Sequence, residues 1–282
     1  LAQKGIADAK VTAVPVVDQT SGTVQGVQYH IDSPAVQVGS VTFSGANPAW
    51  NPTLAAIAKA AAGQNFDPAT QETLLTALKA VYHRQGYLRM EMSGFAHGQP
   101  QVVDGKVLVP VTANISDGPL YRLASMQLSG DVLMKPEEFA RFARLHPGDA
   151  ANEDLLRATM AALATPYRAH GYLRAKIDAV PQFDDAKDTV SYTISVQPGP
   201  VFTMGDLTLN NLNEQQKAEV MRYWPLHKGD VYDATVALNF LLKNKNNLPS
   251  LQGWSGNWKA YEHEDTHIVD LVVTFRRGGV LE

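Results

Sequence analysis

Gly86-Tyr87-Leu88-Arg89 returns 85 residues later as Gly171-Tyr172-Leu173-Arg174. Neighbouring residues match at the same offset, and the matched pairs are Gly45 and Gly130, Gly63 and Gly148, Leu78 and Leu163, and Tyr82 and Tyr167. Matches at one fixed offset over a long span indicate an internal repeat, and a repeat sets the architecture of the whole chain.

The spacing of the repeat holds more strictly than its residue identities. Strand-like hexamers begin at Ser40, Ser125 and Asp206. A glycine follows 23 residues after each of these positions, and another 23 residues lead to Gly86 and Gly171. The third copy has Gln252 at this last position and a glycine one residue later. The sequence therefore predicts a tandem array with a divergent third copy.

The repeat divides the chain into segments. We expect complete repeats at 36–119 (repeat 1), 120–200 (repeat 2) and 201–279 (repeat 3). Residues 1–35 match the C-terminal half of a further repeat, because Gly5 lies 81 residues before Gly86 and Ser33-Pro34 lies seven residues before Ser40. We expect the first half of that repeat to lie outside this fragment, and residues 280–282 to be a cloning scar.

The composition limits the class of protein. The chain has 282 residues, of which 45% are hydrophobic and 18% charged, so it should fold rather than remain disordered. Its net charge of −4 provides no field for attracting nucleic acid, and we expect no nucleic-acid partner. Cysteine is absent, which excludes disulfides and thiolate metal sites.

Each complete repeat has the pattern strand, helix, helix, strand, strand. In repeat 1, Val41 and Phe43 alternate with polar residues as in a half-buried strand, and Asn51-Pro52 and Asp67-Pro68 are typical helix starts. Asp104-Gly105 indicates a hairpin turn between the last two strands. Pro110 lies inside the final strand, where we expect a bulge or an unpaired position.

This arrangement resembles the POTRA family, with tandem β-α-α-β-β units, a glycine between the helices and Gly-Tyr before the second strand. The resemblance covers nearly all of residues 1–278 and is greatest for the arrays of the BamA and TamA families. It implies an α+β fold in which two helices cover a three-stranded sheet. It also implies a periplasmic arm attached to the outer membrane through a C-terminal membrane β-barrel outside this fragment.

The resemblance implies binding rather than catalysis, with no cofactor. The expected partners are unfolded outer-membrane proteins and periplasmic or lipoprotein accessory proteins. In POTRA sheets the second strand lies at an exposed edge, which can accept an extended peptide by strand addition. By position, the expected peptide-binding residues are Leu88, Arg89, Met90, Glu91 and Met92 in repeat 1, and Leu173, Arg174, Ala175, Lys176 and Ile177 in repeat 2. Trp254 and Trp258 form a possible partner patch in repeat 3.

One motif offers a competing interpretation. His263-Glu264-Asp265-Thr266-His267 matches the zinc-protease pattern, which requires both histidines on one face of a helix. Here the pattern falls in the predicted hairpin turn of repeat 3, so we expect a solvated loop, no metal and no enzyme activity. Two alternatives to an assembly factor remain open: the arm of a two-partner secretion transporter, and an interaction scaffold of the cell envelope.

Overall fold

The computed structural model describes residues 10–18, 20, 22–32, 36–130, 132–244 and 247–278. Their contacts divide the chain into two compact units. One contains the residues up to Arg122 together with Asp149–Asp154, and the other contains Leu123–Gly148 together with the residues from Leu155 onward. The α+β class predicted from the sequence is confirmed in all three repeats.

The N-terminal segment forms a hairpin. Strand β1 (Lys10–Val17) pairs antiparallel with β2 (Val24–Asp32). Apolar side chains on both strands are exposed, including Val14 at 42% and Tyr29 at 64%. Gly5, Ser33 and Pro34 lie outside the described residues, so the assignment of this hairpin to a further repeat stays a prediction.

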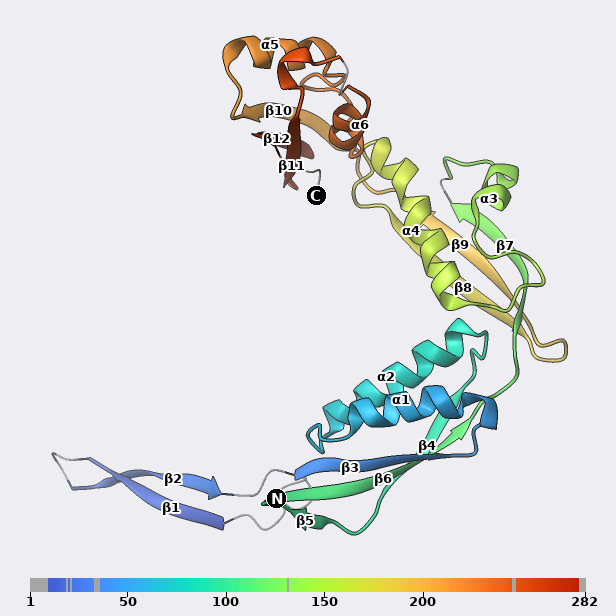
Figure 1. The fold of residues 1–282 in the computed structure, drawn as a ribbon, viewed down its shortest axis with the longest axis vertical. Helices are drawn as coiled ribbons and strands as arrows, with labels where there is room; N and C mark the ends of the chain where they lie inside the picture. The colour runs from blue at the N-terminus through green and yellow to red at the C-terminus, as the bar shows by residue number, and fades with distance from the viewer. Residues whose placement is uncertain are drawn as a thin grey trace. The chain divides into compact units, whose positions relative to one another are not determined.

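Repeat 1 is a sheet with two helices on one face (Figure 1). Its elements are β3 (Val36–Ser44), η2 (Pro48–Trp50), α1 (Asn51–Ala61), α2 (Pro68–Arg84), β4 (Glu91–His97), β5 (Gln101–Val103) and β6 (Lys106–Ser116). Leu54 of α1 and Leu78 and Tyr82 of α2 are buried in one cluster with Ile115 of the central strand β6. The buried apolar side chains of both helices therefore pack in one cluster with the sheet.

The helix starts of repeat 1 follow the predicted signals with one correction. Asp67 accepts a 2.8 Å hydrogen bond from the amide of Thr70 and caps α2, as expected. Helix α1 begins at Asn51, but its N-cap is Trp50, which makes no side-chain cap. The asparagine that caps is Asn47, whose side chain accepts from the amide of Ala49 at 3.0 Å and opens the preceding turn η2.

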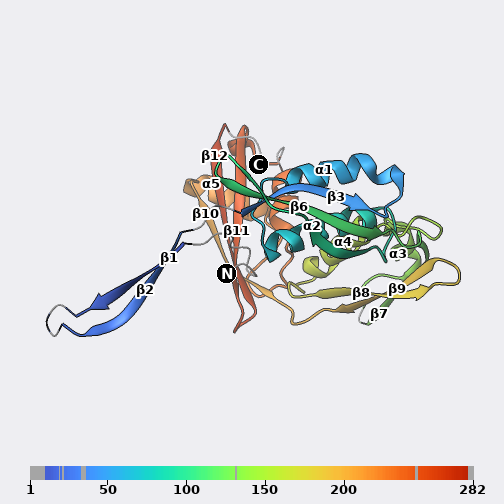
Figure 2. The ribbon, with the colours of Figure 1, turned by 90° about the horizontal axis from the view of Figure 1, so that it is seen from below.

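Repeat 2 has the same plan. Its elements are β7 (Arg122–Gly130), α3 (Pro136–Phe142), α4 (Glu153–Ala169), β8 (Lys176–Asp184) and β9 (Thr189–Gln197). Strands β8 and β9 lie side by side in both views (Figures 1 and 2). Thr159 is fully buried on α4, and its hydroxyl is satisfied there. The hydroxyl donates to the carbonyl of Leu155 at 2.8 Å and accepts from the amide of Arg144 at 3.0 Å.

Repeat 3 diverges in its helices but keeps the sheet. Its elements are β10 (Thr203–Asn210), α5 (Glu214–Tyr223), α6 (Val236–Lys243), η3 (Pro249–Leu251), β11 (Trp254–His263) and β12 (Ile268–Arg277). Trp224, which follows α5, packs on Phe240 of α6 with ring centroids 4.9 Å apart. Trp224 is therefore part of the core, with 4% of its surface exposed.

Pro110 interrupts the central strand of repeat 1 as the sequence predicts. The β3–β6 pairing shifts register between Val38 and Val41, opposite this proline. On the other side, β4 pairs with β6 only as far as His97↔Val111, and β5 resumes at Gln101↔Leu108. A proline has no amide to donate, so the sheet accommodates it where both neighbouring strands are irregular.

Two buried tyrosines should make the protein less stable at high pH. Burial and a 2.7 Å hydrogen bond to Asp117 raise the pKa of Tyr82, and burial raises the pKa of Tyr232 to about 12. Unfolded tyrosine titrates at pH ~10. Because the folded pKa values are higher, this stabilisation is complete below about pH 10 and is lost as the pH rises toward the folded values.

The measurement is urea unfolding at pH 8, 10 and 11.5. The fall in unfolding free energy between pH 10 and 11.5 should be smaller in Tyr82→Phe and in Tyr232→Phe than in the parent. An equal fall in the parent and in both variants would show that neither tyrosine causes it.

Candidate functional site

The second strand of each repeat lies at an edge of its sheet. The strand orders are β3-β6-β4, β7-β9-β8 and β10-β12-β11, so β4, β8 and β11 each end a sheet. An edge strand presents amide and carbonyl groups that can pair with an added strand. The edge positions expected from the family resemblance are therefore confirmed, whereas peptide binding there stays a prediction.

The strands begin later than the sequence suggested. Leu88, Arg89 and Met90 form a turn before β4, which starts at Glu91. Leu173, Arg174 and Ala175 likewise precede β8, which starts at Lys176. The cause is local, because the chain closes turns here: the amide of Met90 bonds to Tyr87 at 3.3 Å and that of Ala175 to Tyr172 at 3.3 Å. Glu91, Met92, Lys176 and Ile177 are the predicted residues that lie within the edge strands.

The Gly-Tyr-Leu-Arg turn has a structural role of its own. The tyrosines pack against the preceding helix, with ring centroids 6.1 Å apart for Tyr82 and Tyr87 and 6.3 Å for Tyr167 and Tyr172. The arginine of each turn lies over an aromatic ring that begins the next repeat. These distances are 5.8 Å from Arg89 to Tyr121 and 5.4 Å from Arg174 to Phe202. The repeated tetrapeptide thus joins helix end, sheet and linker.

The three edges differ in regularity. Strand β4 has a register shift between Ser93 and Ala96, where Gly94 has φ +62°, and such a bulge disfavours strand addition. Strand β8 pairs with β9 without a shift over nine residues. Strand β11 pairs with β12 over ten residues, from Trp254↔Arg277 to His263↔Ile268, also without a shift.

Pro181 reveals which groups of β8 face outward. It pairs in register with Tyr192, and a proline in a strand takes a position whose nitrogen points away from the neighbouring strand. Backbone groups alternate along an antiparallel strand, so Ile177 and Ala179 present their amides outward, whereas Asp178 and Val180 bond to β9. Pro181 has no amide to donate, so the series of outward amides in β8 ends before it. The part of the β8 edge that can pair with an added strand is therefore its N-terminal part.

The tryptophan patch predicted in repeat 3 is only partly exposed. Trp254 packs against the core of the repeat, whereas Trp258 is 37% exposed at the β11 edge. On the opposite face of the strand, the Lys259 ammonium lies 4.7 Å from the centre of the exposed Tyr261 ring. The edge of β11 therefore has an aromatic side chain on each face.

The zinc-protease pattern lies in a hairpin turn, as predicted. His263 ends β11 and contacts Asp270 at 2.9 Å, and residues 264–267 form the turn before β12. The ring of His267 packs edge-on against Phe202, with centroids 5.2 Å apart. Within the described ranges, no group of three or more His, Asp or Glu side chains is placed to hold a metal ion. The helical geometry that zinc hydrolysis needs is not formed.

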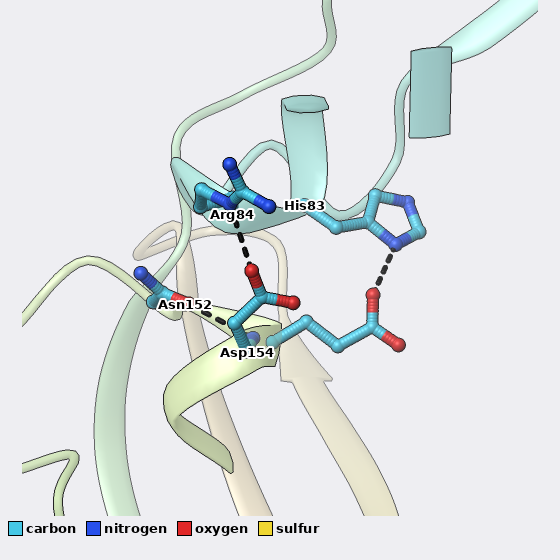
Figure 3. A network of polar contacts seen from close by, with 5 residues as sticks. His83, Arg84, Asn152 and Asp154 are labelled. Carbon is cyan, nitrogen blue, oxygen red and sulfur yellow. Dashed lines mark hydrogen bonds and ion pairs between the residues drawn. The ribbon is translucent and has the colours of Figure 1, made fainter. Parts of the chain in front are cut away.

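An ion pair and a histidine–carboxylate contact join α2 to the first turn of α4 (Figure 3). His83 Nδ1 lies 2.7 Å from Glu153 Oε2, and Arg84 Nε lies 2.7 Å from Asp154 Oδ2. Asn152 caps α4 by accepting from the amide of Asp154 at 2.9 Å. Cations at a helix C-terminus and anions at a helix N-terminus are each favourable. The sequence does not reveal these two contacts, because the partners lie 70 residues apart.

Comparison with known proteins agrees with this geometry. The POTRA family model, described as surface antigen variable number repeat, matches residues 121–199. A protein of Treponema pallidum (strain Nichols), provisionally named an outer membrane protein assembly factor, is 25% identical over 167 residues, which are 57% of this chain and 20% of that protein. The chain therefore spans a small part of this relative.

A solved structure shows the same fold. Haemophilus influenzae BamA POTRA3-5 is 20% identical with a TM-score of 0.56, over 86% of this chain and 96% of that structure. None of the described helices is both long enough and apolar enough to span a membrane. Residues 121–199 thus match the POTRA family model, and the chain has the fold of a tandem array of POTRA-like repeats.

Proposed function

We propose that this chain is the periplasmic arm of an outer-membrane protein assembly factor and that it binds unfolded outer-membrane proteins by β-strand addition. The observation that carries the proposal is the edge position of β4, β8 and β11, one in each repeat. The name of the Treponema pallidum relative supports the assembly role. The work of the arm is binding, because a sheet edge provides hydrogen bonds and no reacting group.

Strand addition suits a substrate class with varied sequences. The hydrogen bonds are made by backbone groups, so an extended segment can bind largely independently of its side chains. The regular edges of β8 and β11 are the better candidates, since β4 is interrupted at Gly94. Accessory proteins that offer an extended strand would use the same edges.

The outward amides of β8 provide the test. The probe is a ten-residue peptide of alternating apolar and polar residues, taken from a strand of an unfolded outer-membrane protein. At saturation it should slow hydrogen exchange at Ile177 and Ala179 at least ten-fold, because these amides gain a partner. Ala179→Pro should keep the fold and abolish the slowing at Ile177. The reason is that β8 loses the outward amide of residue 179, which would donate to the added peptide beside Ile177.

Asp178→Pro is the matched control, because it is the neighbouring exposed residue with a paired amide. It should lower the stability of repeat 2 by about 1–3 kcal/mol, because a ladder hydrogen bond is lost and its acceptor on β9 is left unsatisfied. Glu91 and Lys259 lie on the β4 and β11 edges. The peptide should change hydrogen exchange at their amides by the same factor in Ala179→Pro as in the parent. If Ile177 is slowed equally in Ala179→Pro and in the parent, strand addition at β8 is wrong.

A further inference from the structure

Two sequence motifs that have no role in strand addition contact each other in the structure. Arg174 of the second Gly-Tyr-Leu-Arg copy donates hydrogen bonds to the carboxylates of Glu262 and Glu264. Glu264 belongs to the zinc-protease-like pattern, and Glu262 immediately precedes it. We infer that the contact of Arg174 with Phe202, Glu262 and Glu264, here called the arginine contact, fixes the orientation of repeat 3 on repeat 2.

The linker between these repeats is already held at one point by its backbone. The amide of Phe202 donates to the carbonyl of Gly171 at 2.9 Å, and the amide of Tyr232 donates to the carbonyl of Phe202 at 2.9 Å. Close by, the amide of Ala234 donates to the carbonyl of Arg168 at 3.1 Å. The Phe202 side chain is fully buried. These bonds gather at the linker and the end of α4, so they form one side of the joint.

The arginine contact holds repeat 3 at its other side. Thr203 begins β10 beside Ile268 of β12, and Ile268 pairs with His263 at the end of β11. Two strand spacings, or about 10 Å, therefore separate the linker from the β11 edge, where Glu262 lies. If repeat 3 were attached at the linker alone, it could rotate about the linker relative to repeat 2. A second attachment at the β11 edge, across the width of the sheet, prevents this rotation.

The chemistry of the contact calls for arginine. A planar guanidinium can donate to two carboxylates and stack on an aromatic ring at the same time, whereas an ammonium is a compact point charge. Arg174 does all of this, with its guanidinium 5.4 Å from the centre of the Phe202 ring. His267 packs against the same Phe202 and accepts a 2.9 Å hydrogen bond from the amide of Thr203 through its carbonyl. Glu264, from the motif that resembles a zinc site, therefore belongs to the contact between repeat 2 and repeat 3, while His267 holds the Phe202 ring on which Arg174 lies.

A distance measurement between spin labels tests this inference on the whole chain. The chain has no cysteine, so Ala161→Cys on α4 and Ala218→Cys on α5, both exposed, would carry the only labels. The distance distribution should be narrow in the parent and at least twice as wide in Arg174→Ala. The double variant Glu262→Gln/Glu264→Gln should widen it similarly, and Arg174→Lys to an intermediate extent. In 1 M salt the parent should widen while Arg174→Ala changes little.

Lys187→Ala is the control for removing a cation from repeat 2, because Lys187 pairs only locally, with Asp184 at 2.8 Å, in the β8–β9 turn. It should leave the distribution unchanged. Thermal unfolding of each variant shows whether a wider distribution comes from a loosened contact between the repeats or from an unfolded repeat. If Arg174→Ala fails to fold, the double glutamine variant provides the test. Distributions as narrow as the parent's in both folded variants would overturn the inference. The outcome does not depend on whether the edges bind peptide.

Discussion

Gly130→Ala is expected to destabilise repeat 2 by about 2–5 kcal/mol. Gly130 ends β7 with φ +88°, and a methyl group there would lie 2.5 Å from the carbonyl oxygen of Val196 in the central strand β9. The left-handed conformation costs an L-residue about 1–2 kcal/mol, and relieving the clash costs about 1–3 kcal/mol more. The obstacle is backbone, so the clash can be relieved only by moving one strand away from the other.

Gly148→Ala separates the two costs. Gly148 has φ +92°, but a methyl group there would meet no atom within 4 Å. Its replacement should therefore cost only the ~1–2 kcal/mol of the backbone conformation. The measurement is urea unfolding followed by hydrogen exchange of the β9 amides, which reports repeat 2 alone. Equal losses in the two variants would show that the approach of β7 to β9 does not constrain position 130.

The sequence pattern located these glycines without distinguishing them. Gly130 and Gly148 both recur at the repeat offset, from Gly45 and Gly63, so the repeat pattern treats the two positions alike. The difference between them is the carbonyl of Val196, which lies 66 residues from Gly130. A repeat pattern records that a position is constrained, whereas the constraint itself comes from a neighbour that only the fold brings close.

In the candidate site, too, the sequence pattern predicts some features and only the fold reveals the others. Alternation and turn signals correctly predicted strands near Glu91 and Lys176, but the alternating residues Leu88 and Met90 suggested a strand where local hydrogen bonds form a turn. Periodicity does not reveal strand order, so the edge positions came from the family resemblance. The direction of the β8 amides required the pairing of Pro181 with Tyr192. Sequence gave no sign that Arg174 and Glu264, 90 residues apart, form a contact.

Leu163→Ala is the second large expected effect. Leu163 lies on α4, is fully buried and matches the equally buried Leu78 of repeat 1. Removing a buried leucine side chain costs about 2–5 kcal/mol, because the lost burial is joined by the cost of the cavity. Repeat 2 should therefore unfold at lower urea than in the parent, and exchange of its β9 amides should speed up before that of β6 in repeat 1.

Leu155→Ala is the control on the same helix with the same change. Leu155 and Leu156 are adjacent in sequence, and residues one apart cannot share a helix face. In the structure Leu156 is 6% exposed and Leu155 is 36% exposed. Leu155→Ala should therefore cost less than about 1 kcal/mol, within the range of surface substitutions or slightly above it. A loss in Leu155→Ala that equals the loss in Leu163→Ala would mean that α4 does not pack through the face formed by Leu156, Thr159 and Leu163, and the orientation of this helix on the sheet would have to be revised.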